Sequence, residues 1–193
     1  LDWSLEDVQK NGQPHFMLKE ILEEPEVLRN TMRGRLTKDQ ANVHLGGLKD
    51  VMDQVKNVQR IVLVGCGTAY YAGCVGKYLL ETWAGISTEV EVASEFRYRD
   101  PVIAKNTAVI AISQSGETAD TLAALREGKM KGALALGIVN VVGSTIARET
   151  TAGIYTHAGP EIGVASTKAF ISQCTTLAML SLLLGKTRQL SHT

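Results

Sequence analysis

Short apolar runs alternate with helical patterns from about residue 60 to the end of the chain. Uninterrupted apolar runs predict three strands that are covered on both faces, at 61–64, 108–112 and 133–139. Period-two alternation predicts a half-exposed strand at 88–92, and 153–157 predicts a weaker fifth strand. Helical patterns lie between or after these strands, at 71–79, 117–131, 144–149 and 163–184.

The first sixty residues have helical rather than strand periodicity. Phe16, Met17, Ile21 and Leu22 are spaced for one face of a helix. Pro25 is expected to begin a second short helix that ends at Gly34. The inward residues of that second helix would be Val27, Leu28 and Met32. A further helical face is predicted from Leu45, Leu48, Met52 and Val55.

Strands alternating with helices of this length form β-α-β units with right-handed crossovers. The sequence therefore predicts an α/β fold: a parallel five-stranded sheet with helices on both faces, preceded by N-terminal helices. We divide the chain into a helical lead-in, 1–58, and a sheet domain, 59–193. Ligands of such sheets bind beyond the carboxyl ends of the strands, so the strand-to-helix turns are the candidate sites.

Composition excludes several classes of function. The 193 residues carry 20 Lys+Arg and 20 Asp+Glu, so the chain lacks the basic surface of a nucleic-acid binder or a membrane-surface protein. Three cysteines without CxxC spacing argue against a disulfide framework or a zinc site and favour a reducing cytoplasm. The N-terminus has no signal peptide and no initiator Met, which suggests a fragment or a processed chain.

One segment approaches the lower length limit of a membrane span. Residues 169–185 carry no charge. The segment nevertheless contains five polar side chains: Ser172, Gln173, Thr175, Thr176 and Ser181. We therefore predict a buried helix of a soluble protein rather than a span.

The first candidate turn follows the strand at 61–64. Gly65 and Gly67 match the start of a dinucleotide fingerprint, but Tyr70 stands where the third glycine would be. One interpretation is a nicotinamide-cofactor domain in which Glu89 or Glu91 binds the ribose. The other is a tight structural turn that allows a ligand to approach the backbone.

The second candidate turn, 113–118, is richer in hydrogen-bond donors. Ser113, Gln114, Ser115 and Thr118 surround Gly116 at the start of a predicted helix, without a Lys or Arg. Hydroxyl, amide and backbone N–H donors at a helix N-terminus are typical of a phosphate site. The alternative is that Ser115 and Thr118 only cap the helix, but capping needs a single hydroxyl.

A third turn, 159–168, again places hydroxyls and glycines before a long helix. Three such turns at one edge of a sheet favour a phosphorylated, hydroxyl-rich ligand such as a sugar phosphate.

Taken in order, three motifs resemble a known family. They are Cys66-Gly67-Thr68, Ser113-Gln114-Ser115-Gly116-Glu117-Thr118 and Glu161-Ile162-Gly163-Val164-Ala165-Ser166-Thr167-Lys168. Together with 15–21 and 93–99, they resemble the isomerase part of the glutamine–fructose-6-phosphate aminotransferases, which make glucosamine 6-phosphate. The resemblance covers about 15–184 and the first of that part's two sugar-isomerase (SIS) halves.

The resemblance implies roles for nine residues. Ser113, Gln114, Ser115 and Thr118 would hold the phosphate of fructose 6-phosphate or glucosamine 6-phosphate. The sugar itself would be lined by Cys66, Gly67, Thr68, Val164 and Ser166. Many family members have serine in place of Ala69, and that serine also reaches the phosphate. We therefore expect weaker phosphate binding in this chain, but not its loss.

The family's catalytic groups have no matched position in this stretch. The glutaminase domain with its nucleophilic cysteine, and the second SIS half with its general base, Schiff-base lysine and ring-opening histidine, would lie elsewhere in a full-length protein. We assign no catalytic residue here and do not transfer these roles to Glu161, Lys168 or His157. Lys168 is expected to form a salt bridge or to lie at a helix start. We expect neither cofactor nor metal, and no turnover by this chain alone.

Two further expectations concern class and assembly. The alternative to an enzyme fragment is a non-catalytic SIS-type sensor of sugar phosphates. The apolar circumference of the helix at 164–184 predicts an exposed patch that is covered in a homodimer. The other possibility is that the helices before Arg60 cover this patch and leave a monomer.

Overall fold

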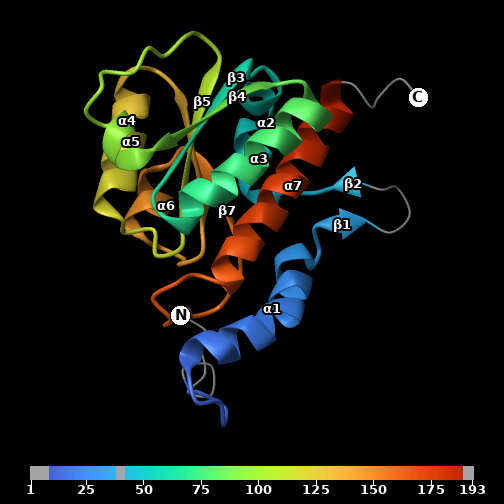
Figure 1. Ribbon diagram of the computed structural model, residues 1–193. Coiled ribbons are helices and arrows are strands. Elements are labelled where there is room, and N and C mark those ends of the chain that lie inside the picture. Colours follow the sequence, from blue (N-terminus) through green and yellow to red (C-terminus); the bar gives the residue numbers. More distant parts are fainter. Residues whose placement is uncertain (1–8, 38–41, 189–193) are drawn as a thin grey trace.

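The computed structural model describes residues 9–37 and 42–188. Its centre is a five-stranded, entirely parallel sheet of strand order β4-β3-β5-β6-β7 (Figure 1). The strands are β3 (Arg60–Gly65), β4 (Ser87–Val92), β5 (Thr107–Ser113), β6 (Leu134–Val139) and β7 (Ala152–Tyr155). All five predicted strands are confirmed within one or two residues, and the buried ones are the apolar runs.

Helices cover both faces of the sheet (Figure 1). One face packs against α3 (Thr68–Ala84), α7 (Lys168–Arg188), the 3-10 helix η2 (Gly46–Val51) and α2 (Met52–Lys56). The other packs against α4 (Ala93–Phe96), α5 (Ala119–Met130) and α6 (Thr145–Glu149). Alternate strand residues divide between the two cores, as with Leu63 and Val64 of β3, because successive side chains point to opposite faces. The predicted α/β architecture is confirmed.

The buried face of α3 consists mostly of small residues, with Leu80 as its one large side chain. A Cβ added at Gly76 would lie 2.8 Å from Leu177 Cδ1 of α7, so glycine permits the close approach of the two helices. Tyr71, Val75 and Tyr78, which helical spacing places on one face, are exposed. The helix at 71–79 is confirmed, and its exposed face is the one that carries these larger side chains.

At the N-terminal end, α1 (Phe16–Met32) is one continuous helix with Pro25 inside it. The prediction of a separate helix beginning at Pro25 is therefore wrong. Proline removes one backbone hydrogen bond, but buried residues on both sides, Glu20 and Val27, hold the two halves in line. Residues 36–43 also contain a short antiparallel pair that the sequence did not predict, β1 (Leu36–Thr37) with β2 (Asn42–Val43).

α7 lies beside α3 and is crossed by α1 near its start (Figure 1). Leu177, Met179, Leu180 and Leu184 are buried in the core shared with α3, whereas Leu182 is exposed. α7 therefore exposes only part of its predicted apolar circumference, and the homodimer stays a prediction. In the described part of the chain, α7 alone is long and apolar enough to cross a membrane. However, 61% of its most apolar window is buried in the fold, as in a core helix.

Candidate functional site

A pocket lies where the order of strands reverses, between the central strands β3 and β5. Parallel strands place their carboxyl ends at one edge, so the turns after β3 and β5 meet there. The pocket has a volume of about 130 Å³ and is lined by Cys66, Thr68, Ala69, Ile112, Ser113, Gln114, Ser115, Thr118 and Gln173. This volume is below the ~300–1,000 Å³ of pockets that enclose whole ligands and suits one group of a ligand.

Six of the nine predicted site residues line this pocket. Gly67, a seventh, lies in the turn between Cys66 and Thr68 with φ +57°, a conformation that favours glycine. Ala69 also lines the pocket, at the position where a serine would add a hydroxyl. None of the nine lining residues carries a charge, so binding here would rely on neutral donors.

The hydroxyls of the 113–118 turn have different tasks. Ser113 Oγ is buried, accepts the Gly116 N–H at 2.9 Å and lies 3.2 Å from Thr118 Oγ1. It thereby holds the turn in shape. Ser115 Oγ accepts the Glu117 N–H at 3.1 Å, which leaves its own hydrogen free to donate to a ligand.

The N-terminus of α5 opens onto this turn. Thr118 is the N-cap residue, yet its side chain makes no capping hydrogen bond. The first N–H groups of a helix have no partner within the helix and carry its positive dipole end. A helix start without a side-chain cap, beside the unused hydrogen of the Ser115 hydroxyl, supports anion binding over the capping alternative.

Two residues of the turn attach it to α6. Gly116 has φ +68°, and an added Cβ would overlap the Ser144 hydroxyl and lie 2.5 Å from Ser144 Cβ. Glu117 Oε1 accepts the Thr145 N–H at 2.8 Å. This backbone hydrogen bond lowers the pKa of the Glu117 carboxyl below its usual value. Glu117 is therefore an ionised acceptor at the start of α6.

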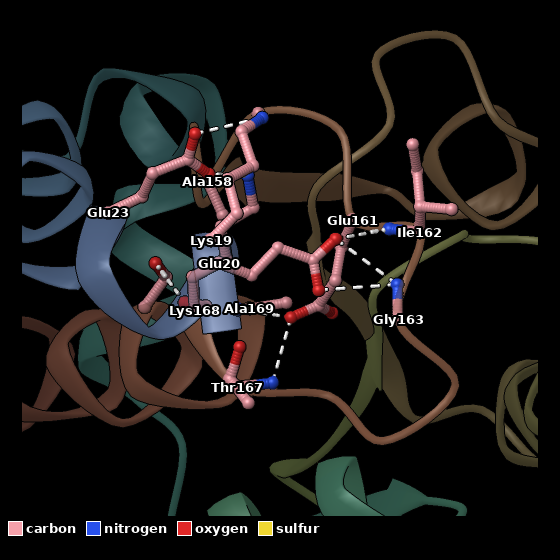
Figure 2. A network of polar contacts seen from close by, with 12 residues as sticks. Lys19, Glu20, Glu23, Ala158, Glu161, Ile162, Gly163, Thr167, Lys168 and Ala169 are labelled. Atoms are coloured by element: carbon pink, nitrogen blue, oxygen red, sulfur yellow. Dashed lines mark hydrogen bonds and ion pairs between the residues drawn. The ribbon is translucent and has the colours of Figure 1, made fainter. Parts of the chain in front are cut away.

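The two remaining predicted residues, Val164 and Ser166, do not line this pocket. They belong to the loop between β7 and α7, where the Val164 side chain is exposed. Ser166 Oγ donates to Glu161 Oε2 at 2.8 Å. The other carboxylate oxygen of Glu161 accepts the Thr167 N–H at 2.8 Å and the Ala169 N–H at 3.2 Å (Figure 2). This cap explains why α7 begins at Lys168, five residues after its predicted start.

A second carboxylate fixes the same loop from α1. Glu20, only 1% exposed, accepts the Ile162 N–H at 2.6 Å and the Gly163 N–H at 3.1 Å (Figure 2). Lys168 Nζ lies 2.7 Å from Glu23 Oε2, also on α1, so its predicted salt bridge is confirmed. Nothing in the sequence singles out Glu20 and Glu23, because charged residues on a helix ordinarily face solvent.

Asn140, directly after β6, was also missed. Its Oδ1 accepts the Ala158 N–H at 2.7 Å and the Thr156 hydroxyl at 3.1 Å, while its Nδ2 donates to the Gly159 carbonyl at 2.7 Å. Its backbone N–H donates to the Gln114 carbonyl at 3.3 Å. Asn140 therefore links the 113–118 turn to the loop that follows β7.

The groups needed for a dinucleotide are otherwise engaged. Glu89 pairs with Arg60 at 2.7 Å, and Glu91 pairs with Arg99 at 2.5 Å. The Glu89 and Glu91 carboxylates thus each bind a guanidinium instead of being available to the hydroxyls of a ribose. The arrangement favours the interpretation of Gly65 and Gly67 as a tight turn.

The order of the parallel strands and the uncharged pocket at the switch point fit the sugar-isomerase (SIS) domains that the sequence motifs resemble. The chain belongs to this family, whose model matches residues 54–183. A glutamine–fructose-6-phosphate aminotransferase (isomerizing) of Chlorobaculum tepidum is 58% identical over 192 residues, which is 100% of this chain and 31% of that protein. The same enzyme of Thermus thermophilus is 53% identical over 188 residues, covering 97% of this chain and 30% of the relative.

A solved structure is similar over nearly the whole chain. It is the C-terminal domain of glucosamine-fructose-6-phosphate aminotransferase from Francisella tularensis, with a TM-score of 0.87 and 42% identity. The match covers 93% of this chain and 50% of that one. The chain therefore spans about a third of the curated relatives and half of this domain.

Proposed function

We propose that the pocket between β3 and β5 binds the phosphate of a sugar phosphate, fructose 6-phosphate or glucosamine 6-phosphate. Ser113, Gln114, Ser115 and Thr118 would hold the phosphate, and the turn at 66–68 would face the sugar. The observation that carries the proposal is the start of α5 without a side-chain cap, next to a pocket lined by hydroxyl and amide groups. Val164 and Ser166 are proposed as sugar contacts from the Glu161-capped loop.

The proposed setting is the first SIS half of an aminotransferase that converts fructose 6-phosphate and glutamine to glucosamine 6-phosphate and glutamate, in the cytoplasm. The names of relatives above 50% identity support this setting over a non-catalytic sensor. A second SIS half and a glutaminase domain would supply the proton transfer and the ammonia. Within the described residues, Glu117 and Glu161 accept backbone N–H groups and Lys168 pairs with Glu23, so none stands ready as a base.

Replacing Ser115 by alanine tests the phosphate assignment. The change removes one donor to a charged group, so affinity for fructose 6-phosphate should fall by about 1–3 kcal/mol. Stability should hardly change, because the Glu117 N–H that loses its acceptor is exposed. Isothermal titration of the wild type and the variant measures the loss. Ser144→Ala, a nearby serine outside the pocket, is the matched control. An equal loss of affinity for unphosphorylated fructose would contradict the assignment of Ser115 to the phosphate.

We also propose that two copies of the chain associate through α1. This helix buries charged side chains and exposes one apolar face, formed by Met17, Leu18, Ile21 and Leu22. Contiguous exposed apolar residues mark interaction surfaces, and a two-fold pairing with a second copy would cover them.

Sedimentation at micromolar concentration should therefore show a dimer. An Ile21→Lys/Leu22→Lys variant should sediment as a monomer, whereas Leu36→Lys, at an exposed leucine on β1, should leave the dimer intact. A wild-type monomer of 20.8 kDa would contradict the pairing.

A further inference from the structure

Gln173 of α7 is a polar residue of the pocket that neither the motifs nor the proposed function uses. Its side chain is 2% exposed and lines the pocket together with Cys66, Thr68 and the 113–118 turn. Its carbonyl oxygen Oε1 is buried and has no hydrogen-bond partner. Buried polar atoms are almost always paired, so an unpaired one that borders a pocket indicates a missing donor.

The chemistry of the pocket limits what this donor can be. An amide oxygen only accepts hydrogen bonds, and the dianion of a phosphate monoester also offers only acceptors, so the two cannot pair. Thr68, Ser115 and Thr118 also line the pocket, but none of their hydroxyls is hydrogen-bonded to Gln173 Oε1. A further source of a donor is the rest of the ligand, where a sugar carries hydroxyl groups.

We propose that Gln173 Oε1 accepts a hydrogen bond from a hydroxyl of the bound sugar, which makes Gln173 a specificity-determining residue. The inference rests on the proposed sugar-phosphate function. The turn before α5 would then recognise the phosphate, and α7 would recognise what the phosphate is attached to. A bare acceptor-only anion such as sulfate would gain nothing from this oxygen.

Gln173→Met, a swap of similar shape without polar atoms, separates these two contributions. We expect affinity for fructose 6-phosphate to fall about five- to tenfold, the range of one neutral hydrogen bond. Affinity for sulfate should stay within about twofold, since that dianion, unlike inorganic phosphate, has no O–H to donate to the amide oxygen. The unfolding midpoint without ligand should stay equal or rise, because the swap removes a buried unpaired oxygen.

Thr176→Val is the matched control. Thr176 lies one turn further along α7, is fully buried, and also has an unpartnered oxygen, but it does not line the pocket. Its replacement should leave both affinities at the wild-type level. If Gln173→Met does not fold, as judged by circular dichroism, Gln173→Ala takes its place in the same titrations.

The titration results distinguish a failure of the Gln173 contact from a failure of the proposed sugar-phosphate binding. A loss of affinity for fructose 6-phosphate alone in the Gln173 variant supports the inference. Wild-type affinity for both ligands, or an equal loss for both, overturns it while the phosphate site stands. Failure of the wild type to bind fructose 6-phosphate overturns the proposed function itself.

Discussion

Replacing Glu23 by glutamine is expected to lower the free energy of unfolding by about 3–5 kcal/mol, because the change leaves a buried ammonium without its counter-charge. Lys168 is 3% exposed and lies 2.7 Å from the Glu23 carboxylate, which also pairs with Lys19 at 2.9 Å. Lys168 is the first residue of α7, so the same change should loosen the loop that carries Val164 and Ser166. Chemical denaturation measures the difference.

Glu26→Gln, on the same helix, is the matched control. Glu26 is 58% exposed and pairs with Arg29 and Arg33 on the surface. Exposed pairs contribute about 0–1 kcal/mol, so this variant should stay close to wild type. Equal small losses for both variants would show that the buried pair does not hold α1 to α7.

The pH dependence of the Glu23 effect follows from its pKa. Burial alone would raise that pKa, but the hydrogen bonds from Lys168 and Lys19 outweigh burial and hold it below the usual 4.5. A depressed pKa means that the stabilisation is complete above 4.5 and is lost as the pH falls through the lower, folded-state value. The difference between wild type and Glu23→Gln should therefore be constant at neutral pH and shrink below pH 4.5.

Gly116→Ala is expected to have the second large effect. A left-handed conformation costs a residue with a side chain about 1–2 kcal/mol. Overlap of the new Cβ with Ser144 should add about 1–3 kcal/mol. The turn carries Ser115 and Thr118, so fructose 6-phosphate affinity should fall together with stability. Thermal unfolding and titration of the same sample measure both losses.

Two further variants separate the conformational cost of Gly116→Ala from the cost of overlap with Ser144. Gly34 has a nearly identical φ, +70°, with open space around it, so Gly34→Ala should pay only the conformational cost. Adding Ser144→Gly to Gly116→Ala should recover the part due to overlap. Ser144 makes no side-chain cap, and glycine is accepted at an N-cap, so this second change is itself mild. No recovery in the double variant would mean that the overlap is not the cause.

The sheet was predictable because its strands are buried on both faces. The runs at 61–64 and 108–112 are apolar without interruption, and this is what a central parallel strand requires. The helices were harder. α3 turns its small residues inward and its tyrosines outward, and α1 buries Glu20 while exposing Leu22. Periodicity identifies a helix. It does not identify the side that faces the core where close packing, as in α3, or buried ion pairs, as in α1, decide the orientation of the helix.

The candidate site was also predictable only in part. The 113–118 turn was predictable because its donors are adjacent in sequence and follow a strand. Gln173 and Asn140 come from separate elements, so only the folded chain brings them to the turn. The polar residues within 169–185 argue against a membrane span, and the long amide of Gln173 in a buried helix also indicates a hydrogen-bonding role.

We propose above that the turn between β5 and α5 holds the phosphate of a sugar phosphate. The most direct test is an NMR titration of the ¹⁵N-labelled chain with fructose 6-phosphate, following backbone amides. The largest shifts should fall on 113–121, with smaller ones at 66–69, and fructose without phosphate should leave 113–121 unchanged. Shifts concentrated elsewhere, or the same response to fructose, would contradict the account.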